Sequence, residues 1–298
     1  MELSWINKLR IALVGLLGLV VIGILAWPAA APADPLGPVR STGVGLSGTV
    51  FLLVLAFGLG FVGYFVTWPH GREIGILTVP FGLAAWAVRS GPMRALTQSN
   101  PLPAEREALV QSLRFEPVYW LLIVAAGFAG VLAAEHLRPA SESRLTLAKI
   151  KGQIKTDTVL TILMAAMIVV LVAQFLLGAF AQNVPTFIKP PAAQPATGQI
   201  VFAGLAAFVA AAFVAKKFFG LSYVWPTVAS VLVVPFAEMA YCRGDTIAVF
   251  AETQPATSFP HAVLAILPIQ LVAFAALGSV IGYWLAVQYD YWRTHEAA

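Results

Sequence analysis

Long apolar runs separated by short polar segments dominate the chain. A helix needs about 20 predominantly apolar residues to cross the hydrocarbon core of a bilayer. Eight runs reach or approach that length, and the third is the shortest of them: residues 10–28, 45–68, 74–88, 119–137, 158–181, 198–215, 221–242 and 268–289. The pattern predicts an all-α integral membrane protein with eight transmembrane helices.

Composition and charge point to the same environment. Of the 298 residues, 59% are hydrophobic and 11% are charged, whereas soluble domains carry about 25% charged residues. A soluble fold of this size would lack the polar side chains to cover its surface. The formal net charge of +4 comes from basic residues that lie mainly between the apolar runs. This is typical of proteins oriented in a lipid bilayer, and we expect no nucleic-acid partner.

The distribution of Lys and Arg predicts the orientation. More of them lie in segments on the side of the N-terminus, and residues 138–157 hold five basic and two acidic residues. Basic residues favour the cytoplasmic side. We therefore expect both termini in the cytoplasm and the protein in the cell's inner (cytoplasmic) membrane. One alternative stays open, because Lys8, Arg10, residues 11–26 and the alanines at 29–31 also fit a cleavable secretory signal.

The chain overlays on itself when it is shifted by 155 positions. Several prolines and terminal charges keep register without a gap: Val79, Pro80 and Phe81 on Val234, Pro235 and Phe236, Glu135 on Asp290, and Arg138 on Arg293. Units with an even number of spans share one orientation in the membrane. The repeat predicts two tandem four-helix units in parallel orientation, residues 1–140 and 158–298, joined by a basic cytoplasmic linker at 141–157.

One acidic residue interrupts an apolar span and is a candidate for function. Glu238 lies in the seventh span, five residues before Arg243. Ionisable groups within spans are costly and mark functional sites. One interpretation is a carboxylate that reaches the outer interface and pairs with Arg243, and the other is a site for a cation or proton. Trp86 and its repeat partner Tyr241 lie near the same face and complete the candidate polar site.

Charged pairs also end the fourth and eighth spans. Glu135 precedes Arg138 by three residues, and Asp290 precedes Arg293 by three residues. Residues at this spacing share a helical face, and a basic residue near a helix C-terminus complements the helix dipole. We interpret the four as anchors at the inner interface.

Prolines and glycines within the spans predict local backbone features. Pro80 and Pro235 are expected to kink their helices, each freeing a carbonyl group. Glycines let membrane helices approach closely. Gly58, Gly60 and Gly63 in the second span, with Gly127 in the fourth, are therefore expected to form helix-packing faces.

Residues 100–116 form the one sizeable outer segment with mixed charge. Leu109 and Leu113 fall on one helical side, and Arg106 and Arg114 are among its charged residues. An amphipathic helix of this kind lies in the membrane interface. We expect a short helix on the outer leaflet.

Cofactor-binding patterns are absent from the sequence. The single cysteine, Cys242, excludes a cysteine-based metal cage. The four histidines fall near span ends or in loops: His70, His136, His261 and His295. Haem b in a bilayer needs facing histidines within helices. We predict no cofactor and no metal site.

Two resemblances follow from this layout. The tandem four-helix units resemble the architecture of heme A synthases, but the haem-ligating histidines of that family have no counterpart in the second, sixth or eighth spans. Residues 90–95 look similar to a short stretch of the eight-helix anchor subunits of DMSO-reductase-type enzymes. The likeness ends at these features, and we assign the chain to neither family.

Three functions remain open on this basis. The first is a non-catalytic multi-pass subunit that packs against other membrane subunits in a larger complex, because the loops are small and no nucleophile set is present. The second is a transporter or channel with its pathway between the two units, suggested by the repeat and the paired prolines. The third is a quinone-binding anchor of a redox complex using Glu238, Trp86 or Tyr241. No catalytic residue is predicted, and an intramembrane enzyme is the least favoured reading.

Overall fold

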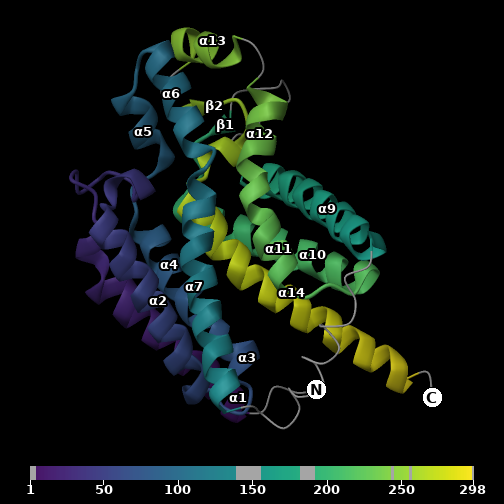
Figure 1. Cartoon of the computed structure of the whole chain (residues 1–298). Coiled ribbons are helices and arrows are strands. Elements are labelled where there is room, and N and C mark those ends of the chain that lie inside the picture. Colours follow the sequence, from purple (N-terminus) through teal and green to yellow (C-terminus); the bar gives the residue numbers. More distant parts are fainter. Residues whose placement is uncertain (1–4, 139–155, 182–191, 243–244, 255–256, 297–298) are drawn as a thin grey trace.

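The computed structural model describes residues 5–138, 156–181, 192–242, 245–254 and 257–296 (Figure 1). The described chain is almost wholly helical. The first half contains α1 (Trp5–Gly18), continued by a π-helical segment η1 (Leu19–Leu25), then η2 (Trp27–Ala29), η3 (Ser41–Gly43), α2 (Leu46–Val66), α3 (Gly71–Ile74), η4 (Gly75–Leu77), α4 (Thr78–Arg89), α5 (Met93–Ser99), α6 (Pro103–Leu113) and α7 (Glu116–Leu137).

The second half repeats this helical character and adds a short ladder. It contains α9 (Thr156–Phe180), β1 (Ala192–Ala193), α10 (Thr197–Phe219), α11 (Val224–Ala229), η5 (Ser230–Leu232), α12 (Val233–Tyr241), α13 (Thr246–Thr253), β2 (Ser258–Phe259), η6 (Ala262–Ala265) and α14 (Pro268–Glu296). The two strands pair antiparallel, Ala192 opposite Phe259.

Seven helices of the described chain are long and apolar enough to cross a membrane. A bent pair, Gly71–Arg89 with Met93–Ser99, brings the number up to eight if it counts as one span. This pair contains the predicted third span, the shortest of the apolar runs. In lipid the backbone has no water to bond to, so spanning segments become helices. The prediction of an all-α membrane protein is confirmed at this level.

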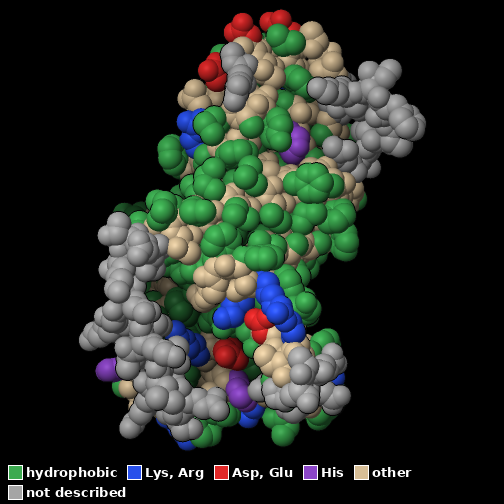
Figure 2. Space-filling model, turned by 90° about the vertical axis from the view of Figure 1, so that its right-hand side faces the viewer, with side chains coloured by type: hydrophobic (Ala, Val, Ile, Leu, Met, Phe, Trp, Pro, Cys, Tyr) green, Lys and Arg blue, Asp and Glu red, His purple; other side chains and the backbone are tan. Residues whose placement is uncertain are grey.

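The molecule has two unlike ends. Helix α1 begins and α14 finishes at the same end, called here the terminal end (Figure 1). Helices α5, α6 and α13 gather at the opposite end with the β-ladder, and we call this the cap end. On the face shown in Figure 2, hydrophobic side chains form a broad band, and most charged side chains gather beyond it, towards the two ends. A band of this kind suits a bilayer.

Helix α14 is the central element of the bundle. It packs against α10 and α11 of its own half and against α4 and α7 of the first half. Each residue from 269 to 276 is at most 3% exposed. Three of these residues are alanines, and small side chains let neighbouring helices approach closely. The core of the protein therefore lies between the two halves, along α14.

Close backbone contact joins α2 to α7. A Cβ atom on Gly60 would collide with the carbonyl oxygen of Gly127, and one on Gly63 would lie 2.5 Å from Oγ1 of Thr78. These contacts place Gly60, Gly63 and Gly127 on packing faces. The expectation was wrong for Gly58, which has open space around its Cα and lies on the exposed side of α2.

The proline-containing spans are interrupted just before the prolines. The turns η4 and η5 are single 3₁₀ segments, and each leads directly into a helix whose third residue is proline, Pro80 in α4 and Pro235 in α12. Proline fits the first turn of a helix because no N–H partner is required there. The two turns begin at Gly75 and Ser230, 155 positions apart.

The short helix predicted within residues 100–116 is α6, whose place on the outer leaflet stays a prediction. It leads into α7 at the cap end (Figure 1), and the two form one continuous candidate span, Pro103–Leu137. Its apolar residues Leu109 and Leu113 are each 6% exposed. Helix α13 of the second half packs against α6. The apolar face is therefore covered by protein instead of lipid, because the second half supplies a partner that the local sequence does not reveal.

Candidate functional site

An ion pair joins the two halves at the cap end. Nε of Arg114, the residue that ends α6, donates to Oε2 of Glu238 in α12 at 2.8 Å. The Glu238 side chain is 5% exposed and that of Arg114 is 45% exposed. Glu238 therefore does not reach out to the interface as an exposed carboxylate. Arg243, its predicted partner, lies outside the described residues.

Two cavities flank this ion pair. The first, called here the inner cavity, is a narrow, mainly apolar cavity of about 70 Å³ between α5, α6, α12, α13 and the segment before α14. The second is a more open hollow of about 760 Å³ that runs from α6 and α7 to α9 and α12. Glu238 and Cys242 line both of them. The Arg114–Glu238 pair thus stands at the boundary between an inner chamber and an open one.

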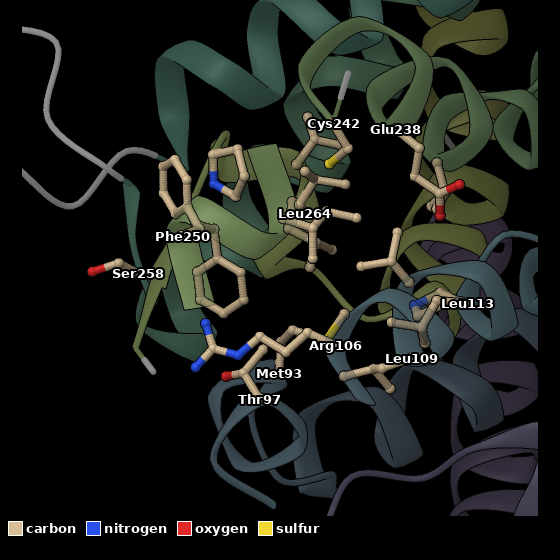
Figure 3. A pocket seen from close by; sticks show the side chains of 18 residues that line it. Met93, Thr97, Arg106, Leu109, Leu113, Glu238, Cys242, Phe250, Ser258 and Leu264 are labelled. Atoms are coloured by element: carbon tan, nitrogen blue, oxygen red, sulfur yellow. The ribbon is translucent and has the colours of Figure 1, made fainter. Parts of the chain in front are cut away.

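A second arginine lines the inner cavity. Arg106 is 6% exposed, and its Nε donates to the carbonyl oxygen of Asn100 at 3.3 Å. No acidic side chain within the described ranges forms an ion pair with it. Arg106 and Glu238 lie on opposite sides of the cavity, with apolar side chains such as Leu264 between them (Figure 3). The chamber is an apolar space with a cation at one side and a carboxylate at the other.

Glu238 also keeps one oxygen free of donors from the described residues. Its Oε1 atom is buried and has no hydrogen-bond partner among them. Buried polar atoms are almost always bonded, so such an exception calls for an explanation. Since Glu238 lines both cavities, a molecule in either one could supply the missing donor.

Two further groups near this site are held in their neutral forms. Cys242 follows the end of α12, and burial, together with the nearby Glu238 carboxylate, raises the pKa of its thiol to about 11. Burial lowers the pKa of His261, whose ring stacks on Tyr241 with centroids 3.9 Å apart. A protonated thiol is a poor nucleophile. The Cys242 thiol is therefore not set up for covalent chemistry at neutral pH.

The structure separates the other predicted members of the polar site from Glu238. Trp86 is fully buried between Trp27 and Trp120, with ring centroids 6.2 and 6.4 Å away. Tyr241 packs on His261, and neither Trp86 nor Tyr241 lines the two cavities. The quinone-binding alternative, with Glu238, Trp86 or Tyr241 as its residues, stays a prediction.

Sequence reasoning missed both arginines of the site. Arg106, Leu109 and Leu113 share one helical face by spacing, so an arginine on the apolar side of α6 was a signal of burial. Arg114 gave no local signal, since its partner lies 124 positions away.

The predicted anchors make contacts across helices instead of along them. In the first half, Oε1 of Glu135 lies 3.7 Å from Nη1 of Arg72 in α3, and Glu135 is 3% exposed. The guanidinium of Arg138 sits 4.5 Å above the Trp68 ring. Glu135 therefore pairs with a cation of α3, and the role of the four residues as anchors at the inner interface stays a prediction.

The second half shows a similar arrangement at the terminal end. Asp290 accepts a hydrogen bond from Nζ of Lys217, which lies in the last turn of α10, and Arg293 is exposed. In the first half Glu135, near the end of α7, pairs with Arg72 in α3, just after α2. In the second half Asp290, near the end of α14, pairs with Lys217 at the end of α10.

Within the described residues, no group of His, Cys, Asp and Glu has the geometry to hold a metal ion. Comparison with family models, curated proteins and solved structures finds no match for this chain.

Proposed function

We propose that this protein binds a small amphipathic molecule between its two halves at the cap end. Two adjoining spaces beside Glu238, the open hollow and the inner cavity, carry the proposal. Ligand sites are concave, mostly apolar and contain a few converging polar groups, with volumes of roughly 300–1,000 Å³. The hollow of about 760 Å³ lies in this range, and the mainly apolar inner cavity that adjoins it has Arg106 and Glu238 as its charged groups.

The open hollow supports entry from the bilayer. It is lined by Met167, Leu232 and Met239, whose side chains are 51%, 45% and 60% exposed. In a membrane, exposed apolar side chains of this kind face lipid. A molecule with an apolar chain would therefore reach the site sideways, along α9 and α12.

Filling the cavity is expected to abolish binding. Leu264 projects into the chamber (Figure 3), and Leu264→Trp would occupy the space of the ligand. Leu171→Trp is the matched control, because Leu171 on α9 is 49% exposed and lines neither cavity. The measurement is binding of a fluorescent fatty-acid analogue to the purified protein in phosphatidylcholine nanodiscs. Unchanged binding by a folded Leu264→Trp variant would refute the proposed site.

A packing role in a larger membrane complex remains a prediction and is compatible with ligand binding.

The transporter alternative has one observation in its favour. Polar contacts join the halves at both ends. Arg114 pairs with Glu238 at the cap end. At the terminal end the Tyr223 hydroxyl donates to the carbonyl oxygen of Arg72 at 3.3 Å. Between them lies an apolar groove of about 110 Å³ lined by residues including Pro80. A pathway closed at both ends would have this arrangement.

We also propose that the chain consists of two tandem four-helix units in parallel orientation. Three observations support it. Helices α2 and α7 pack closely in the first half, as α10 and α14 do in the second. The 3₁₀ turns before Pro80 and Pro235 keep the 155-residue register. The first and fifth spans, η1 and α9, end at Leu25 and Phe180 in that same register.

We further propose that the terminal end faces the cytoplasm. Gln98 on α5 and Thr294 on α14 are exposed at opposite ends. In a Cys242→Ser background, Gln98→Cys is expected to react with a membrane-impermeant maleimide in intact cells. Thr294→Cys should react only after the cells are opened, since the basic segments favour the inner side. The reverse pattern would overturn this orientation.

A further inference from the structure

We infer that the ligand is a long-chain carboxylate whose head group is held by Arg106 in the inner cavity. This inference rests on the proposed binding function and names its ligand class. It follows from the charge balance of the chamber, from its shape and from the groups on its two sides.

The charge balance requires an anion near Arg106. Arg106 is 6% exposed, and its one side-chain hydrogen bond within the described part of the chain goes to the neutral carbonyl oxygen of Asn100. A buried charge is costly unless it is paired. Glu238 does not serve as the partner, because its Oε2 is bonded to Arg114 on the far side of the cavity. A ligand that brings one negative charge would balance Arg106.

The chemistry of the head group follows from this single cation. Arginine binds a carboxylate through two parallel N–H···O bonds. A neutral quinone or alcohol would leave the guanidinium charge uncompensated. A phosphate monoester would bring nearly two negative charges, whereas Arg106 is the one arginine of the described chain that lines this cavity. A carboxylate therefore fits best.

The rest of the inner cavity, together with the adjoining hollow, suits an alkyl chain. Leu109, Leu113, Phe250 and Leu264 line it between Arg106 and Glu238 (Figure 3). Removing a methylene group from water in such surroundings contributes about 0.8 kcal/mol. The exposed apolar side chains of the adjoining hollow extend this surface towards the lipid.

The experiment compares two molecules that share a chain and differ in the head group. Palmitate and hexadecanol compete with a fluorescent fatty-acid analogue on the full-length protein in phosphatidylcholine nanodiscs, and empty nanodiscs report partitioning alone. We expect palmitate to bind about 10- to 100-fold more tightly than hexadecanol, as for hydrogen bonds to charged groups. Arg106→Gln should remove this difference and leave hexadecanol binding unchanged.

Two variants sharpen the result. Arg106→Lys keeps the charge and should keep most of the preference for palmitate. Arg94→Gln removes an exposed arginine at the same end that does not line the cavity, and it should change nothing. Circular dichroism and gel filtration of each variant confirm that it is folded.

The possible failures are distinguishable. If palmitate and hexadecanol bind equally, or if a short-chain quinone analogue binds more tightly than palmitate to wild type, the carboxylate assignment is wrong while the cavity still binds a ligand. The assignment also fails if Arg106→Gln retains the palmitate preference. If the analogue binds the Leu264→Trp variant like wild type, the binding function itself is wrong.

Discussion

Gly60→Ala is expected to lower the free energy of unfolding by about 1–3 kcal/mol, the usual cost of overpacking a core. The new Cβ atom would collide with the carbonyl oxygen of Gly127. This neighbour is backbone, so relief requires α2 and α7 to move apart and lose many close contacts at once. Unfolding in mixed micelles of detergent and dodecyl sulfate, followed by tryptophan fluorescence, would measure the effect.

Gly58→Ala is the control, two residues away in the same helix. A Cβ atom at Gly58 meets nothing within 4 Å. Alanine is the better helix former by about 1 kcal/mol, so this variant should be as stable as wild type or slightly more stable. Equal destabilisation by the two substitutions would contradict the α2–α7 packing described here.

Arg114→Ala is expected to destabilise the protein far more than Glu238→Gln. Removing Arg114 leaves the Glu238 carboxylate, which is 5% exposed, without its partner, and an unpaired buried charge costs about 3–5 kcal/mol. Removing the charge of Glu238 leaves Arg114, which is 45% exposed and can turn to water. The cost should then be about 1 kcal/mol or less, as for an exposed pair.

The double variant tests the cause of this asymmetry. If the loss in Arg114→Ala comes from the stranded carboxylate, adding Glu238→Gln should recover most of it, since no buried charge then remains. The same unfolding assay measures all three variants. A double variant that is as unstable as Arg114→Ala alone would show that Arg114 acts through packing, and the ion pair would lose its assigned role.

Only part of the ligand site could be predicted from the sequence. Glu238 stood out because a carboxylate in an apolar span is rare. Its partner could not be found, because Arg114 is remote in sequence and charges in loops have many possible partners. Arg106 was assigned to an interfacial helix, since a local pattern cannot tell whether lipid or protein covers an apolar face. Trp86 and Tyr241 were grouped with Glu238 by depth alone, and the structure shows that their rings pack against Trp27 and His261.

What the sequence determined by itself is the helical, membrane-spanning character of the chain, because a backbone in lipid must satisfy its own hydrogen bonds and the length of an apolar run is a local property. The 3₁₀ turns before Pro80 and Pro235 also depend mainly on the local sequence, because proline acts within its own helical turn. What the tertiary structure decided is which faces meet. Gly58 and Gly60 look alike in sequence, and only the position of α7 buries one and exposes the other. The pairing of Arg114 with Glu238 and the chamber beside them arise in the same way, because both depend on two segments that meet only when the halves pack together.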